Sequence, residues 1–182
     1  MLGVLAGFGL AAATGLNAYL PLLIVGLLAR YTDLISLAAP WDALTHPVVL
    51  AVIGVLLAIE VTVDKIPAVD TVNDVIQTLF RPAAGAVLFA ASGNVISHVS
   101  PVLAMVCGLL IAGGVHTAKA AARPAVTAGT LGTGNPVVSL AEDAVSGVTT
   151  VVAVVAPVLI MLLVLLGVWL FIRRYHRRNA RN

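Results

Sequence analysis

Long apolar runs make up most of this chain, and a run that can cross a lipid bilayer restricts the fold more than any other feature. The segments 48–59 and 101–114 contain no charged residue at all. Over the whole chain 60% of residues are hydrophobic and 10% are charged, whereas soluble domains carry about 25% charged residues. A water-soluble fold could not bury so much Leu, Val and Ala. The sequence therefore predicts an all-α integral membrane protein.

About five transmembrane helices are expected, because each needs about 20 residues to cross the hydrocarbon core. They are predicted over 3–29, 48–66, 71–93, 101–122 and 139–172. Proline lacks a backbone donor and clashes with the preceding turn, so Pro67 should end the second span and Pro157 should break the long fifth one. Pro82 should kink the third span near Phe80. The Gly- and Thr-rich stretch 125–136 is predicted to be an irregular loop.

Basic residues gather at the C-terminal end of the chain. The segment 173–182 holds half of all Lys and Arg, which is typical of the cytoplasmic side of a membrane helix. We therefore expect one transmembrane domain over 1–172 and a basic cytoplasmic tail over 173–182. Membrane lipid is the expected partner of this tail. A nucleic-acid partner is not expected, because a short tail offers no fold to position one.

Two short stretches resemble each other and suggest an internal duplication. The stretches are PAVDTVNDV at 67–75 and PVVSLAEDAV at 136–145. Their prolines and their last aspartates align, which suggests two helix-loop-helix units over 48–95 and 101–160. Transporters often arise from such duplications, with the binding site where the repeats meet. A match of this length also arises by chance.

Acidic residues beside the apolar runs are the first candidates for a binding site. Glu60 and Asp64 stand four residues apart and share one helical face. Two carboxylates in a low dielectric repel each other, so at least one of them should hold a proton or a cation. Ionisable groups inside a membrane are functional candidates by default. The alternative for Asp64 is a solvated position at the lipid headgroups.

Four further acidic candidates follow the two aligned prolines. Asp70 and Glu142 suit a structural role, since Asp70 and Ser139 are good N-caps and Glu142 could close a capping box with Ser139. Asp74 and Asp143 lie one turn further into their helices. A polar stripe that includes Asp143 could line a water path or hydrogen-bond to a neighbouring helix. The stripe consists of Ser139, Asp143, Ser146 and Thr150.

Three basic candidates and one amide complete the set. His116, Lys119 and Arg123 are spaced three and four apart on one helical face at the end of the span predicted over 101–122. Lys119 or Arg123 could pair there with Glu60 or Asp64, or the three could hold an anionic group of a substrate. His116 suits a proton relay because imidazole titrates near neutral pH, and a metal site is not predicted because no second His or Cys stands at ligand spacing. Asn17, in the middle of the first span, could hydrogen-bond across helices or contact a substrate.

Several stretches resemble the bacterial domain-of-unknown-function family 4126, whose members are small multi-pass membrane proteins. They are GLNAYLPLL (15–23), IPAVDTVND (66–74), RPAAGAVLFA (81–90) and GTGNPVVSLAED (132–143). The resemblance implies a multi-pass protein of the bacterial inner (plasma) membrane. It implies no activity, because the family has none that can be carried over to this chain.

The residues favour a small transporter or channel that moves an ion or small solute, with carboxylates binding a cation or proton. Five spans leave little room for an aqueous path inside one protomer, so a homo-oligomer is expected. The alternative is a membrane protein that binds lipid or assists the assembly of a complex. An enzyme is not predicted, because no catalytic motif or cofactor fingerprint is present.

Overall fold

The computed structural model describes residues 2–63, 67–92 and 100–159, together with 162, 165–167, 169, 170 and 173. All regular structure in these residues is helical, so the expected all-α class is confirmed for this part of the chain. The elements are α1 (Leu2–Leu16), α2 (Tyr19–Tyr31), the short 3₁₀ helix η1 (Trp41–Thr45), α3 (Pro47–Val63), α4 (Pro67–Ala91), α5 (Pro101–Thr130) and α6 (Asn135–Val155).

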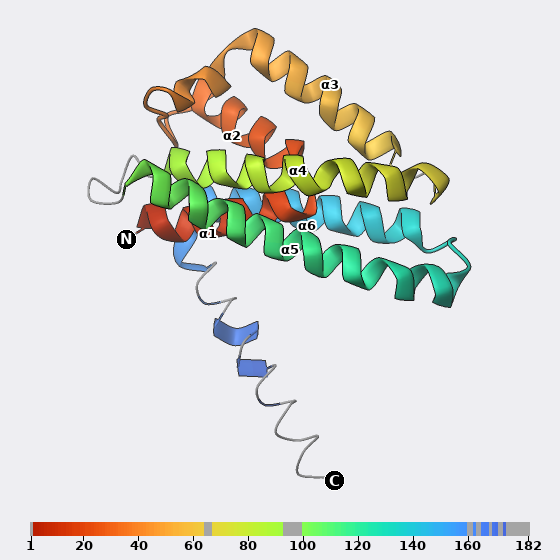
Figure 1. Ribbon diagram of the computed structural model, residues 1–182. Helices are drawn as coiled ribbons and strands as arrows, with labels where there is room; N and C mark the ends of the chain where they lie inside the picture. Colours follow the sequence, from red (N-terminus) through yellow and green to blue (C-terminus); the bar gives the residue numbers. More distant parts are fainter. Residues whose placement is uncertain are drawn as a thin grey trace.

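Helix α1 forms the centre of the bundle and contacts α4, α5 and α6. Helices α4 and α5 run along each other, while α2 and α3 lie together on the opposite side of α4 (Figure 1). The crossing of α4 and α5 is tight because it is made by glycines. A Cβ on Gly108 would collide with the backbone of Gly85, so small residues here allow a backbone approach that larger ones would prevent.

The first predicted span, 3–29, is wrong as a single helix, because the chain breaks between α1 and α2. Leu16 ends α1 and Tyr19 begins α2. The Asn17 side chain explains the break: its Oδ1 accepts hydrogen bonds from the backbone N–H groups of Tyr19 at 3.1 Å and Leu20 at 2.9 Å. An amide oxygen that satisfies the open donors of a first turn starts a new helix.

The fourth predicted span is longer than expected. Helix α5 continues to Thr130, which contradicts the irregular loop predicted over 125–136. The alanines of this stretch suit a helix, and the hydroxyls of Thr127 and Thr130 donate to carbonyls one turn back within it. The helix ends where Leu131 and Gly132 adopt positive φ angles of 51° and 83°. The connection to α6 is therefore only a short turn.

The prolines have mixed outcomes. The break predicted at Pro157 is confirmed, since α6 ends at Val155; a residue that precedes proline is pushed away from helical geometry. Pro67 begins α4, in the first-turn position where proline is favoured, and α3 is described only to Val63. Pro82 lies inside α4, which runs through it as one helix.

Many large apolar side chains lie on the surface of the described helices, and several charged side chains lie inside the bundle. Large apolar side chains such as Val55, Leu79 and Leu110 lie 60%, 73% and 65% exposed, whereas Arg81 and Glu60 are 0% and 1% exposed. Two described helices, α5 and α6, are long and apolar enough to cross a membrane. Helices α1, α2 and α3 and the segment Val75–Ala91 of α4 are apolar but shorter.

Candidate functional site

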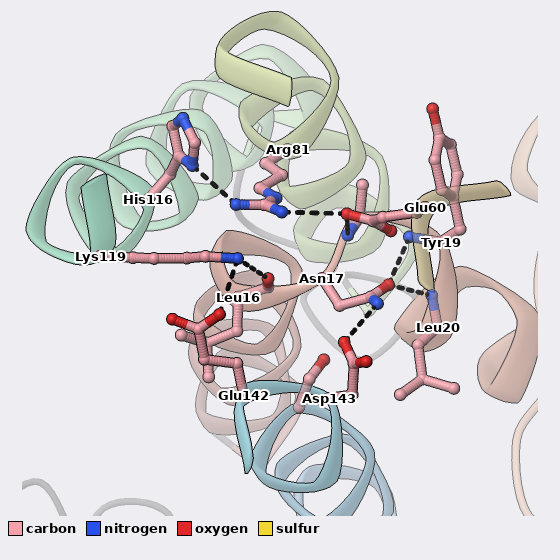
Figure 2. A network of polar contacts seen from close by, with 12 residues as sticks. Leu16, Asn17, Tyr19, Leu20, Glu60, Arg81, His116, Lys119, Glu142 and Asp143 are labelled. Carbon is pink, nitrogen blue, oxygen red and sulfur yellow. Dashed lines mark hydrogen bonds and ion pairs between the residues drawn. The ribbon is translucent and has the colours of Figure 1, made fainter. Parts of the chain in front are cut away.

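A network of buried polar side chains surrounds the break between α1 and α2 (Figure 2). The break brings the carboxyl end of one short helix and the amino end of another to the same place. Carbonyl groups at the first end carry partial negative charge, and N–H groups at the second carry partial positive charge. Side chains from α3, α4, α5 and α6 converge on these two ends.

Glu60 approaches the amino end of α2. Its Oε1 lies 3.5 Å from the backbone nitrogen of Ala18 and accepts a hydrogen bond from Arg81 NH2 at 3.1 Å. Both side chains of this ion pair are fully buried. Carboxylates are stabilised at a helix N-terminus, and a buried charge requires such partners to offset its lost hydration. The carboxylate is thus fixed between a guanidinium and a helix end.

Arg81 also connects this carboxylate to α5. Its NH1 lies 3.0 Å from His116 Nδ1, and the Thr78 hydroxyl lies 3.0 Å from His116 Nε2. A guanidinium has donors only, so Nδ1 accepts this hydrogen bond. A chain of contacts therefore runs from Thr78 through His116 and Arg81 to Glu60.

The carboxyl end of α1 receives a cation. Lys119 Nζ donates to the Leu16 carbonyl at 3.2 Å and lies 2.9 Å from Glu142 Oε2. Arg123 NH2 donates to the same oxygen at 3.0 Å. One carboxylate of α6 therefore holds two cations of α5, and one of these cations is placed on the helix end that favours positive charge.

The polar stripe of α6 binds α1. Asn17 Nδ2 donates to Asp143 Oδ1 at 2.8 Å, and Ser146 Oγ donates to the Ala13 carbonyl at 2.9 Å. Thr150 donates to the Ser146 carbonyl within α6. Of the two roles predicted for this stripe, hydrogen bonding to a neighbouring helix is the one that the contacts display.

A cavity of about 250 Å³ lies between α4 and α5 and reaches His116. His116 itself is only 3% exposed, while Thr78 and Thr117 on the same cavity are exposed. Gly113 and Gly114 line the cavity on the side of α5. A Cβ on Gly114 would meet no atom within 4 Å, so this side of the cavity is open. The cavity therefore joins the outside of the bundle to one end of the network. Its lining residues are Thr78, Pro82, Leu109, Leu110, Gly113, Gly114, His116 and Thr117.

Most of the residues singled out from the sequence meet in this network. They are Asn17, Glu60, His116, Lys119, Arg123, Glu142 and Asp143. Asp64 lies outside the described residues, as do the side chains of Asp70 and Asp74. The capping box expected for Ser139 and Glu142 is wrong, because α6 already begins at Asn135. Proline suits the first turn of a helix, so Pro136 permits this earlier start and leaves Glu142 available for cations.

Sequence reasoning missed two members of the network, Arg81 and Thr78. Arg81 carried a usable signal, because an arginine inside a predicted apolar span is costly unless it has a role. The pairing also differs from the expectation for Glu60, whose ion pair is formed with Arg81, while Lys119 and Arg123 share Glu142. Helical spacing placed the cations on one face but did not indicate which acidic helix would face them.

The chain belongs to the family described as Domain of unknown function (DUF4126), whose model matches residues 4–177. The match covers nearly the whole chain, including every residue of the network. No curated protein and no solved structure matches the chain.

Proposed function

We propose that this protein is a multi-pass membrane transporter that binds an ion or small solute at the break between α1 and α2. The observation that supports the proposal most is the pair of opposed helix ends, surrounded by buried ionisable side chains (Figure 2). Transporters commonly bind their cargo at discontinuous helices, with half-helix ends directed at its charged groups. A bacterial inner membrane, a cytoplasmic C-terminal tail and a homo-oligomer complete the proposal.

The exposed surface supports a membrane location. Monomeric soluble proteins rarely expose apolar patches of more than a few hundred Å², whereas α3 alone exposes Val48, Val52, Val55 and Ile59 along one face. Helices α1 and α2 have 15 and 13 residues, so each is only about 20 Å long at 1.5 Å per residue. The hydrocarbon core is about 30 Å thick. Neither helix crosses it alone, and together they form one interrupted span.

The interruption lies where a cargo would be held. Lys119 occupies the negative end of α1, and Glu60 occupies the positive end of α2. These side chains stand in the places that the cationic and anionic groups of a cargo would take. We infer that cargo binding exchanges some of these internal contacts for contacts with the cargo.

The number of charges favours transport over a structural role. Asn17 satisfies the backbone N–H groups of Tyr19 and Leu20, and the Glu60 contact with the Ala18 nitrogen adds only a long hydrogen bond of 3.5 Å. The described network adds three carboxylates and three cations, all at least partly buried. Removing one partner of a buried pair costs about 3–5 kcal/mol, so such groups are a liability in a scaffold without a charged ligand. They are suited to binding and releasing ions.

The proposal is tested by charge movement in proteoliposomes on a solid-supported membrane, across a panel of ions and pH values. Wild type should give transient currents, and Glu60→Gln should abolish them because it removes the carboxylate at the helix end. Asp33→Asn is the matched control, since it removes one negative charge from an exposed position outside the network. Electroneutral exchange is covered by parallel ion-flux measurements. Absence of both currents and flux in wild type would contradict transport.

Lipid binding without transport is a second candidate, and one observation favours it. A cavity of about 440 Å³ lies at the other end of α1, lined mainly by apolar residues that include Leu10, Val25 and Leu88. Cavities of about 150 Å³ with such linings already bind small apolar molecules. Ala6→Phe should fill this cavity and reduce the co-purification of lipid, measured by native mass spectrometry. Unchanged currents in that variant would show that transport does not depend on this cavity.

A further inference from the structure

We propose that His116 binds the coupling proton of the transport cycle, and that protonation of its Nδ1 releases Arg81 from α5. This inference rests on the proposed transport function and names the ion that drives it. Three features of the structure support it: the contacts of the imidazole, the cavity beside it and the packing of α4 on α5.

The contacts fix the protonation state of His116 in this conformation. Arg81 NH1 lies 3.0 Å from Nδ1, and because the guanidinium only donates, Nδ1 must carry a lone pair. The single ring proton of a neutral imidazole is then on Nε2, from which it is donated to the Thr78 hydroxyl at 3.0 Å. His116 is thus held as the neutral Nε2–H tautomer.

Addition of a proton to Nδ1 makes this contact impossible. The ring would change from neutral to a charge of +1, and two N–H donors would face each other across 3.0 Å. Like charges at that distance in a buried site disfavour the charged form, so the imidazolium and the guanidinium must move apart. Arg81 keeps its ion pair with Glu60 on α3, and the contact between α4 and α5 opens.

The charged neighbours of His116 come from several helices. Arg81 faces it from α4, on which Asp74 lies one turn before Thr78 with its side chain outside the described residues. Lys119 and Arg123 follow on α5, and Glu142 of α6 is their counter-charge. Helix α1 contributes no titratable side chain. Among the described contacts, Arg81 is the charge that faces His116 Nδ1.

The packing of α4 on α5 allows a local opening. Gly85 and Gly108 form a backbone contact too close for any side chain, one turn from Arg81 and two turns from His116. The cavity beside His116 begins beyond that crossing. The two helices can therefore separate at the polar end while the glycine crossing holds.

The opening is linked to the helix break. Arg81 and the Ala18 backbone contact the same oxygen of Glu60, at 3.1 and 3.5 Å. A displaced guanidinium therefore moves the carboxylate that lies at the amino end of α2. Proton uptake at His116 therefore changes the positions of Arg81 and Glu60, and with them the place where we expect cargo to bind.

The direct test measures the distance between α4 and α5 as a function of pH. Spin labels are placed on cysteines at Leu79 and Leu110, two exposed positions on the two helices, in a Cys107→Ser background. Electron–electron double resonance should show a longer-distance population when the pH falls from about 8 to about 4, a range that extends below ordinary imidazole titration because the contact with Arg81 disfavours the imidazolium. His116→Gln should abolish this change, because an amide gains no proton in this range. His46→Gln, at an exposed histidine, should retain it.

A distance that is independent of pH in wild type, or an equal change in His116→Gln, would overturn the proposal. If His116→Gln fails to fold, nitrogen NMR of a chain whose other three histidines are Gln reads the same site. The ring should be the Nε2–H tautomer at high pH and doubly protonated at low pH. A ring with Nδ1–H at high pH would overturn the proposal.

The result also separates this inference from the transport function. Currents in wild type together with a distance that is independent of pH would support transport and reject His116 as the site of the coupling proton. A pH-dependent distance without currents or ion flux would remove the transport function and support His116 as the proton site.

Discussion

The two halves of α4 hold the molecule together by different means. From Ala84 to Ala91 the helix packs through small and apolar side chains, with Leu88 and Phe89 buried against α1 and α5. Around Gln77 and Arg81 it packs through buried polar groups. Close apolar packing has one arrangement, whereas hydrogen bonds and ion pairs can be exchanged for others. We propose that the apolar half serves as a scaffold and that the polar half responds to an ion.

The largest effect should come from the polar half. Arg81→Leu leaves the Glu60 carboxylate without its guanidinium in a buried site, which should cost about 3–5 kcal/mol of folding free energy. Unfolding by sodium dodecyl sulfate measures the change. The double variant Glu60→Leu, Arg81→Leu should recover most of the lost stability, because it leaves no half of this pair behind. A double variant as unstable as Arg81→Leu would show that the lost stability does not come from the unpaired Glu60 carboxylate.

A smaller loss is expected in the apolar half. Gly108→Ala adds a methyl group against the Gly85 backbone and should destabilise the fold by about 1–3 kcal/mol, as overpacking does. Gly114→Ala, on the same helix, faces open space and should stabilise it by about 0.5–1 kcal/mol through helix propensity. The same unfolding assay compares them, and equal effects at the two positions would contradict the tight crossing.

The break itself should contribute about 1–2 kcal/mol. Asn17→Ala removes the oxygen that caps α2 and the donor to Asp143, and loss of a cap costs about that much. Asn17→Ser restores an oxygen at the cap but no amide donor, so it should recover part of the loss. Full recovery with Ser would show that the contact with Asp143 contributes nothing to stability.

The smallest effect should come from the polar stripe. Ser146→Ala removes one hydrogen bond from α6 to the Ala13 carbonyl, a change of about 0.5–1.5 kcal/mol. Thr150→Ser is the matched control, because it keeps the hydroxyl that bonds within α6. Unfolding of the two variants should rank Ser146→Ala as the less stable. The opposite order would show that the volume of the Thr150 side chain contributes more to stability than the hydrogen bond of Ser146.

The sequence predicted those features that depend on a single helix. The spacing of His116, Lys119 and Arg123 placed them on one face, and Pro157 marked the end of α6 correctly. The break at Asn17 also had a local signal, since Asn is a favoured N-cap residue and Pro21 is tolerated in the first turn of a helix. The long apolar run around it favoured one span instead. Only the contacts of the Asn17 side chain show that two helices are present.

The pairing of charges depends on how helices pack, which periodicity does not specify. Glu60 could have met any cation, and it meets Arg81 because α3 ends beside the middle of α4 and the start of α2. Helix α5 continues through Thr127 and Thr130, whose hydroxyls bond back to carbonyls of the same helix. Gly- and Thr-rich composition is typical of loops, and composition does not show whether the hydroxyls bond within a helix. The internal duplication and the single domain stay predictions.

We propose that the helix break lies on a transport path, and the accessibility of the break to water-soluble reagents tests this proposal. Ala18 is fully buried and lies at the break, so a cysteine is placed there in a Cys107→Ser background. Membrane-impermeant thiol reagents are then applied from each side of proteoliposomes at high and low pH. We expect reagents to label this cysteine from both sides of the membrane, and the side from which labelling is faster should change with pH. A cysteine that reacts from neither side at any pH, in a protein that still folds, would contradict it.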